Sequence, residues 1–330
     1  MSNILLIDVD KIADKKLKIP NLALMQISAW HKQGGRDAVG LIKEPVDKDK
    51  VMVLDIDKAY LSCIFTKNRP LAEELVATLM KHRKDIQISA GGTGIGNLPD
   101  WLPKEMQKIK PDYDLYPSEY SQGYTTRGCI RTCGFCVVPQ KEGIIKPWQK
   151  PDKFHDDKFD TCMIMDNNLF GAPLSWQDSV FSWFSKNSIK MLSPQGWDAR
   201  LLNQHRCEML ASVKHVDGRL HFAWDNMQDE SAVRTAIGLL EKNGFNLRRN
   251  VSFYVLCGYN TTFEQDLYRC VKLKDMGVRA YAMRYTQTPA LNALARWTAL
   301  PQLFWKIGFE EYTRDKKKWD KRGVSSDGNH

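Results

Sequence analysis

Three of the eight cysteines in the chain lie close together, in the segment CIRTCGFC, at Cys129, Cys133 and Cys136. Thiolates are ligands of zinc and of iron–sulfur clusters. Structural zinc usually takes four ligands in two close pairs, whereas this segment offers three, with His155 as the nearest downstream histidine. A [4Fe–4S] cluster held by three thiolates keeps one iron open to a small molecule. The spacing therefore favours an iron–sulfur cluster over structural zinc or three buried thiols.

The same segment resembles the Cys-x3-Cys-x2-Cys signature of the radical S-adenosylmethionine (SAM) superfamily, including an aromatic residue, Phe135, before the last cysteine. The resemblance implies that Cys129, Cys133 and Cys136 hold a [4Fe–4S] cluster whose open iron chelates the amino and carboxylate groups of SAM. It also implies an enzyme that cleaves SAM reductively to a 5′-deoxyadenosyl radical. Phe135 is expected near the adenine, and the electron is expected from a donor such as flavodoxin or ferredoxin.

Two later segments match places where this superfamily holds SAM. MIMDNNLF stands where many members carry Gly-Gly-Glu, and the resemblance gives Asp166 and Asn167 the methionine amino group. The same residues could simply form a turn at a strand end. In SPQGWDAR, Ser193 and Gln195 are candidates for the ribose or carboxylate of SAM, and Arg200 is a candidate for a carboxylate. Arg200 could instead pair locally at the start of the next helix.

Two further segments are candidates for the adenine and the substrate. VLCGYNTTFEQD partly matches the glycine-rich adenine-binding segment, and places Gly258 at the adenine. Trp224, Asp225 and Asn226 end another predicted strand and are candidates for a substrate pocket. Asp225 could instead cap the following helix. The substrate itself is not evident from the sequence.

These motifs lie at the ends of predicted strands that alternate with predicted helices. Six strands separated by helices predict a partial (β/α)6 TIM-type barrel over residues 119–293, with its active site at the carboxyl ends of the strands. The predicted strands are 123–128, 161–166, 189–195, 219–225, 251–258 and 279–285. The predicted helices are 173–186, 199–213, 230–244 and 261–277.

Residues 1–118 also alternate between the two patterns, which predicts an α/β domain with an open parallel Rossmann-like sheet. Strands are expected at 3–8, 38–42, 50–56, 59–65 and 86–94, and helices at 21–35 and 70–83. Placed before such a barrel, this domain resembles the cobalamin-binding-type domain of one radical SAM subgroup. Its first helix and the glycine turn SAGGTGIGNLP carry that resemblance.

A cobalt-ligating histidine in that family lies in Asp-x-His-x-x-Gly. Here His31 and Gly34 give only His-x-x-Gly, because position 29 is Ala, so His31 is expected to be a surface histidine. Cobalamin bound without a protein histidine stays open, and would favour methyl transfer. The glycines at 91, 92 and 94 could merely form a tight turn. The other five cysteines are scattered, which argues against an auxiliary cluster.

The chain carries a formal net charge of +9, which permits an anionic partner without demonstrating one. Residues 294–330 are expected to be helical and then basic. An alternative function is therefore a non-catalytic nucleic-acid-binding protein with a structural metal loop, and a third is a cluster-bearing sensor that binds SAM without turnover. The start MSNILLIDVD resembles no leader peptide, and no apolar run approaches the ~20 residues of a membrane span, so a cytoplasmic protein with no membrane partner is expected.

Overall fold

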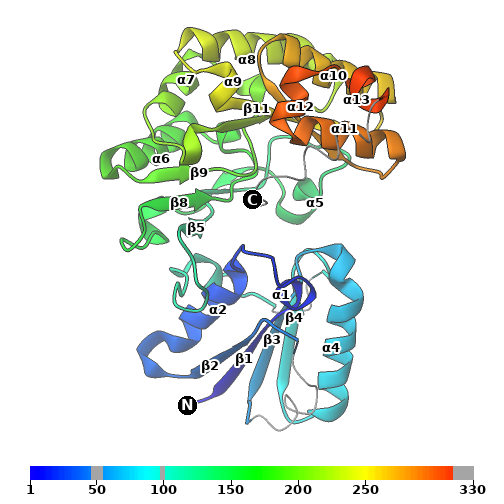
Figure 1. The fold of residues 1–330 in the computed structure, drawn as a ribbon. Coiled ribbons are helices and arrows are strands. Elements are labelled where there is room, and N and C mark those ends of the chain that lie inside the picture. Colours follow the sequence, from blue (N-terminus) through cyan, green and yellow to red (C-terminus); the bar gives the residue numbers. More distant parts are fainter. Residues whose placement is uncertain (46–54, 97–100, 315–330) are drawn as a thin grey trace. The chain divides into compact units, whose positions relative to one another are not determined.

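The computed structural model describes residues 1–45, 55–96 and 101–314. The chain divides into two compact units, one made of residues 1–123 with 149–159, and the other of residues 124–148 with those from 160 onward. Both units are α/β and contain parallel sheets, as predicted (Figure 1). No helix in the described part of the chain is both long and apolar enough to cross a membrane.

The first unit is built on a four-stranded parallel sheet with the order β2-β1-β3-β4. Its strands are β1 (Asn3–Asp8), β2 (Ala38–Ile42), β3 (Lys58–Ser62) and β4 (Gln87–Gly91). Its helices are α1 (Val9–Ala13), α2 (Leu22–Lys32) and α4 (Arg69–His82), with 3-10 turns η1 (Gln33–Gly35), η2 (Thr66–Asn68), η3 (Met106–Lys108) and η4 (Pro151–Lys153). The short strand β5 (Ser121–Gly123) ends the first stretch of this unit.

Alternate residues of β1 face opposite sides of this sheet, as the period of a strand requires. Leu5 and Ile7 belong to the apolar cluster that includes Leu79 of α4. Ile4 and Leu6 belong to a separate cluster that includes Leu24 of α2. The two helices therefore cover opposite faces of the sheet. The predicted strand at 50–56 falls mostly outside the described residues, and residues 55 and 56 are not in a strand.

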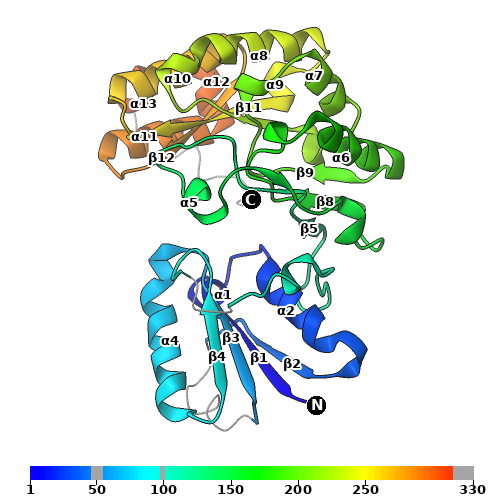
Figure 2. The same ribbon diagram turned by 180° about the vertical axis from the view of Figure 1, so that it is seen from behind.

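The second unit contains the parallel strands β10 (Leu220–Ala223), β11 (Val251–Cys257) and β12 (Arg279–Arg284), and the parallel pair β8 (Thr161–Ile164) and β9 (Lys190–Leu192). A short antiparallel pair joins β6 (Thr126–Arg127) to β7 (Lys146–Pro147). The helices α6 (Leu174–Asn187), α7 (Gln204–Ala211), α8 (Glu230–Lys242) and α10 (Phe263–Asp275) follow one another along one side of the strands (Figure 2). The remaining helices are α5 (Val138–Glu142), α9 (Leu247–Asn250), α11 (Pro289–Ala299), α12 (Pro301–Lys306) and α13 (Phe309–Arg314).

Local sequence explains why these helices form where they do. α8 buries Val233, Ala236, Ile237 and Leu240, which recur at helical spacing along one face. α10 begins at a capping box, in which the Thr262 side chain accepts from the backbone of residue 265 and the Gln265 side chain accepts in return. This Thr-x-x-Gln pattern fixes the start of the helix directly after β11.

Two boundaries differ from the expected ones. The first unit continues to residue 123 and also takes residues 149–159, rather than ending at 118. The predicted strand at 123–128 is broken, since β5 ends at Gly123 and β6 holds only two residues. The expected boundary at 293/294 falls inside α11, whose Leu291, Leu294 and Trp297 are buried. Because Thr298 Oγ1 also accepts the N–H of Ala282 in β12 at 3.1 Å, this helix is part of the second unit.

Candidate active site

The cysteine loop leads from β6 into α5, and its three cysteines are free and half-buried. Gly128 opens the loop with a φ of +82°, and a Cβ there would lie 2.6 Å from the carbonyl oxygen of Gly143. Glycine is the residue that tolerates both conditions. The N–H of Gly128 donates to Glu142 at 2.9 Å, and Arg127 pairs with the same carboxylate at 2.9 Å. Glu142 thus ties the start of the loop to α5.

Two N–H groups approach the sulfur of Cys129. The backbone N–H of Arg131 donates at 3.3 Å, and Asn168 Nδ2 donates at 3.7 Å. Such donors orient a metal ligand. Within the described residues, however, no three or more Cys, His, Asp or Glu side chains are gathered into a metal site. The loop supplies donors whose chemistry suits a cluster, but its three sulfurs do not converge.

Asp198 lies at the centre of a polar network beside the loop, with a side chain that is 6% exposed. It accepts hydrogen bonds from Arg131 Nε at 3.1 Å and from Asn168 Nδ2 at 3.2 Å. Arg200 makes a bidentate contact with it, Nε at 2.7 Å and Nη2 at 3.1 Å. Burial alone would raise the pKa of Asp198, but Arg200 and Arg131 outweigh burial and hold that pKa below its ordinary value.

The network joins three separate segments of the second unit: the cysteine loop, the turn after β8, and η6 (Ala199–Leu201). Arg200 was expected to pair with a carboxylate of SAM or with a local aspartate. The structure places it on Asp198 and, at 3.4 Å, on Asp229. Of the two expected pairings, the structure therefore contains the local one with an aspartate.

Asp166 follows β8 and is buried beneath the entry to the loop. Its carboxylate accepts the N–H of Thr125 at 2.6 Å and the hydroxyl of the same residue. Burial raises the pKa of Asp166 to about 6, against the opposing hydrogen bonds from Thr125 and Thr126. Asn167 Nδ2 donates to Glu142 at 3.1 Å. Both residues are thus engaged in supporting the loop rather than facing a ligand.

Phe135 lies against Tyr259, which in turn lies against Tyr285. Its ring is 5.4 Å from that of Tyr259, edge to face, and Tyr259 is 4.8 Å from Tyr285 in the same manner. Tyr259 follows β11 and Tyr285 follows β12. The last turn of the cysteine loop therefore contacts the residue that follows the carboxyl end of β11, and reaches that of β12 through Tyr259. Gly134 permits the approach, because a Cβ there would lie 2.5 Å from Tyr259 Oη.

Gly258 forms a tight turn after β11, with a φ of +78°. A Cβ there would lie 2.8 Å from the side chains of Leu291 and Thr286. Its N–H donates to the buried carboxylate of Asp266 at 2.8 Å. Asp266 in turn pairs with the buried guanidinium of Arg269 at 2.6 Å. The buried ion pair of Asp266 and Arg269 therefore holds the backbone at Gly258 in place.

Arg269 secures the carboxyl ends of two strands. Its guanidinium is completely buried and donates to the carbonyl oxygen of Trp224 at 2.6 Å and to that of Leu256 at 2.7 Å. Trp224 follows β10, and Leu256 lies near the end of β11. A buried charge of this kind is tolerated only when it is paired and hydrogen-bonded, as it is here.

The three candidates for a substrate pocket separate in the structure. Trp224 is fully buried, and its Nε1 donates to the carbonyl oxygen of Asn226 at 2.8 Å. Asp225 does not cap a helix and instead accepts the N–H of Leu256 at 3.2 Å. Burial raises the pKa of its carboxyl group. Asn226 is exposed.

Ser193 and Gln195 follow β9, where they were expected. Ser193 is half-buried and Gln195 is exposed, and their side chains make no hydrogen bond with other described residues. They are available to a ligand, but nothing in the chain orients them.

Cys133 shows how closely the loop and the strand ends interact. Its thiol pKa is raised, first by burial and then by Cys136, Asp225 and Cys129, while Arg200 opposes the rise. The same side chain therefore lies within electrostatic range of the other two cysteines, of the residue after β10, and of the Asp198 network. The structure brings predicted residues from the loop, from η6 and from the strand ends into one neighbourhood.

Other residues of the first unit pack closely against its glycine turn. A Cβ on Gly91 would lie 2.2 Å from the ring of Trp101, and one on Gly92 would lie 2.2 Å from the carbonyl oxygen of Cys63. His31 was expected on the surface, but its side chain is only 12% exposed. Its Nδ1 contacts Asp37 at 2.7 Å and its Nε2 contacts Tyr60 Oη at 3.1 Å.

Four residues of this neighbourhood were not identified as site residues from the sequence: Asn168, Asp198, Tyr259 and Arg269. Asn168 and Asp198 stand inside the quoted segments DNN and QGWDAR, and Tyr259 directly follows Gly258, so their positions carried a signal. Arg269 carried only its spacing of three from Asp266 on a predicted helix. Comparisons of the chain with models of known families, with curated proteins and with solved structures found no match.

Proposed function

We propose that the chain is a radical SAM enzyme in which Cys129, Cys133 and Cys136 hold a [4Fe–4S] cluster. The observation that carries the proposal is the loop itself: three free thiols at this spacing, with two N–H groups directed at the first sulfur. When bound, such a cluster supplies the electron for reductive cleavage of SAM. Convergence of the three sulfurs would accompany cluster binding, because metal sites commonly form together with their metal.

The fold proposed for this enzyme is a Rossmann-like first unit and a partial (β/α) barrel in the second. Isolated parallel bridges pair Met191 with His215 and Trp197 with Phe222. They extend β9 toward β10, and so support one continuous run of parallel strands from β8 to β12. In such an arrangement, ligands bind at the carboxyl ends of the strands, which is the end that carries the cysteine loop.

We assign the chain's own residues the following roles toward SAM. The edge of Phe135 and the ring of Tyr259 supply an aromatic surface for the adenine, close to the turn at Gly258. Arg200, held by Asp198, presents its remaining N–H groups to a carboxylate. Ser193 and Gln195 supply polar contacts for the ribose. Asp166 and Asn167 keep the loop in place instead of contacting the methionine amino group.

Cobalamin is not favoured by the described residues of the first unit. Both ring nitrogens of His31 are engaged, and Trp101 and Cys63 occupy the space beside Gly91 and Gly92. We therefore derive no methyl-transfer step through cobalamin. A reducing cytoplasm and an electron donor such as flavodoxin or ferredoxin would suit the eight free cysteines and the proposed cluster.

Anaerobic purification and reconstitution, with metal analysis, test this proposal. We expect a brown protein with about four irons per chain, and formation of 5′-deoxyadenosine from SAM under a strong reductant. Cys129→Ala, Cys133→Ala and Cys136→Ala should each lose both signals. Cys207→Ala, which removes a buried thiol on α7, is the matched control and should retain them.

The competing functions predict other results. A colourless protein that contains only zinc would favour a structural metal loop and would contradict the proposal. An iron-loaded protein that binds SAM but forms no 5′-deoxyadenosine would indicate a sensor. Full iron content in all three loop variants would disprove the ligand assignment.

A further inference from the structure

Two adjoining cavities lie at the amino-terminal ends of β10, β11 and β12. The first has a volume of about 680 Å³ and the second about 170 Å³. Both are lined by Arg219, Arg249 and Asn250, so they share a wall. The candidate active site follows the opposite, carboxyl ends of the same strands. These cavities are therefore separate from it.

Four arginines line the two cavities between them. Arg219 precedes β10, Arg248 and Arg249 lie in α9 before β11, and Arg279 begins β12. The first cavity contains one carboxylate, Asp217, and the second contains none. In the described part of the chain, no salt bridge involves Arg219, Arg248 or Arg249. The positive charge gathered here is thus largely unbalanced.

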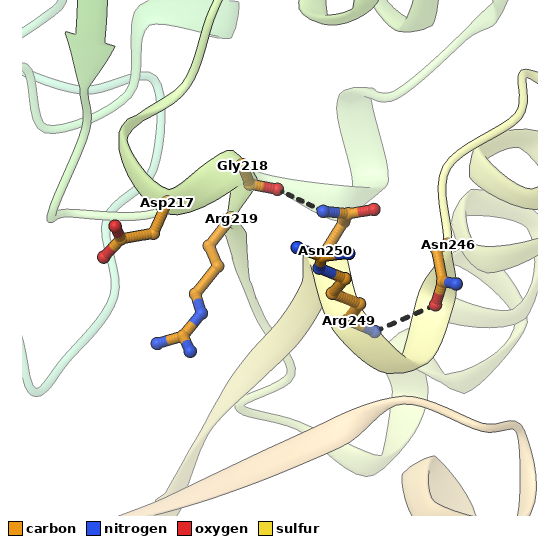
Figure 3. Close-up of a pocket in the computed structure, with 6 residues that line it drawn as sticks. All are labelled: Asp217, Gly218, Arg219, Asn246, Arg249 and Asn250. Carbon is orange, nitrogen blue, oxygen red and sulfur yellow. Dashed lines mark hydrogen bonds between the residues drawn. The ribbon is translucent and has the colours of Figure 1, made fainter.

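The turns that carry these arginines are held together by specific bonds (Figure 3). Asn250 Nδ2 donates to the carbonyl oxygen of Gly218 at 2.7 Å, which joins the entry of β10 to that of β11. Asn246 Oδ1 accepts the N–H of Arg249 at 3.0 Å and caps α9. Asp217 adopts a φ of +56°, a left-handed conformation that few non-glycine residues take. The lining is therefore a built feature rather than a chance group of surface chains.

Arg279 is the most enclosed of the four. It is half-buried, one of its N–H groups donates to the carbonyl oxygen of Ala299, and its Nε is buried with no hydrogen-bond partner in the described structure. Burial lowers the pKa of Arg279, and the positive charge of Arg219 lowers it further. Burial also lowers the pKa of His221, and Arg219 and Arg279 lower it further. These groups repel one another, and an anion would relieve that repulsion.

Aromatic rings hold two of the guanidinium groups in place. Arg279 lies 4.2 Å from the ring centre of Tyr281, and Arg248 lies 4.7 Å from that of Trp305. A guanidinium held over a ring keeps its edge N–H groups for an oxygen ligand. Arginine is suited to phosphate because its planar fork can donate two parallel hydrogen bonds.

The spread of the arginines indicates more than one phosphate. Leu220 pairs with Val251, and Ser252 pairs with Arg279, so the three strand entries lie side by side. Neighbouring strands are about 4.8 Å apart, and the arginines therefore extend over roughly 10 Å. We propose that these two cavities bind a ligand that carries two or more phosphate groups. The site does not depend on the cysteine loop or on the proposed SAM chemistry.

Such phosphates could belong to a small molecule or to a nucleic-acid strand, and binding measurements distinguish the two. The probes are inorganic phosphate, pyrophosphate, ATP and a fluorescent single-stranded oligonucleotide, each titrated into the full chain. We expect pyrophosphate or the oligonucleotide to bind more tightly than inorganic phosphate. For a strand, affinity should also fall steeply with salt because counterions are released.

The variant pair Arg219→Gln with Arg249→Gln should weaken binding at least about tenfold, since each arginine–phosphate contact is charge-assisted. Arg234→Gln removes one exposed arginine on α8 and controls for the loss of a positive charge away from the cavities; it should bind as the original chain does. Basic residues beyond 314 are present in every protein compared. Thermal unfolding of each variant checks that it is folded.

The outcomes separate clearly. Loss of pyrophosphate and ATP binding in the double variant supports a small phosphorylated ligand, and loss of oligonucleotide binding alone supports a strand. The proposal is overturned if no probe binds the original chain, or if the double variant and Arg234→Gln bind every probe equally.

Discussion

The carboxyl ends of the strands differ between the two units although both units are α/β. In the first unit, side chains fill this edge: Trp101 covers Gly91, and the Cys63 backbone contacts Gly92. The carboxylate of Asp10 accepts hydrogen bonds from the N–H groups of Ile64 and Phe65. In the second unit, the same edge carries thiols, an aromatic group and a charged network. The same kind of sheet edge is thus closed by packing in one unit and equipped with reactive groups in the other.

The difference teaches where to look for chemistry in a sheet of this kind. Parallel sheets direct several strand ends to one edge, but an edge becomes a site only where side chains there are not consumed by packing. Asp198 is the clearest case, because its hydrogen bonds join its own segment, through Arg200, to two segments that are distant in the sequence. The buried pair of Asp266 and Arg269 lies beneath that edge and holds it.

Removing Arg269 should produce the largest effect. Arg269→Ala leaves the carboxylate of Asp266 buried without its partner, which typically costs about 3–5 kcal/mol. Urea unfolding measures the loss. Arg69→Ala, which breaks the exposed pair with Glu73 in the first unit, should lose at most about 1 kcal/mol. Equal losses for the two variants would show that the edge of the second unit does not depend on the buried pair.

The pH dependence of stability tests the buried carboxyl that supports the cysteine loop. The pKa of Asp166 is raised to about 6 in the folded chain from the ordinary 3.8. A raised pKa means that its contribution is fully present below about pH 4 and is lost as the pH rises through about 6, by up to ~3 kcal/mol. Asp166→Asn removes this titration. The free energy of unfolding of the variant should therefore increase relative to that of the original chain between about pH 4 and pH 7.

Urea unfolding at several pH values measures that difference. Parallel curves for the two proteins would mean that Asp166 is ionised in the folded chain at an ordinary pKa. Asp37→Asn in the first unit gives the opposite case: the pKa of Asp37 is lowered, first by its hydrogen bond with His31. Its contribution should be present above the ordinary pKa and lost on acidification.

Adding a methyl group to a glycine compares the two edges directly. Gly91→Ala places a Cβ 2.2 Å from the buried indole of Trp101, and we expect a loss of about 1–3 kcal/mol from overpacking. Gly134→Ala meets only the hydroxyl end of Tyr259, a half-buried side chain that can move. That variant should lose little stability but should alter iron content or SAM cleavage. A larger stability loss at Gly134 than at Gly91 would reverse the comparison.

The sequence predicted the parallel α/β sheets because strand and helix periods alternate clearly in it. It could not predict the break in the strand expected at 123–128, because the N–H of Thr125, which lies in the break, donates to the carboxylate of the distant Asp166. Nor could it predict that Trp101 covers Gly91, since that contact is long-range packing rather than a local pattern.

The candidate site likewise has features that the sequence predicts and features that it does not. Local spacing identified the three cysteines and Phe135 as neighbours. The partner of Asp166 depends on which segments meet in three dimensions, and in the structure it is Thr125. The local pairing of Arg200, by contrast, was one of the two predicted alternatives, and it forms with Asp198. At a strand end, a residue that holds a loop and a residue that faces a ligand can be of the same polar type. The sequence alone therefore does not distinguish the two roles.

The smallest expected effect lies at His31, where the closed edge of the first unit can be tested for a hidden ligand role. His31→Gln replaces a ring that contacts Asp37 and Tyr60 by an amide of similar reach. The loss should be about 1 kcal/mol, because one or two partly buried hydrogen bonds are weakened. If the first unit is closed by packing, hydroxocobalamin added to the original chain and to the variant should give identical absorption spectra. A spectrum that changes with the original chain and not with the variant would show that His31 leaves its partners to bind cobalt, and would remove the contrast between the two edges.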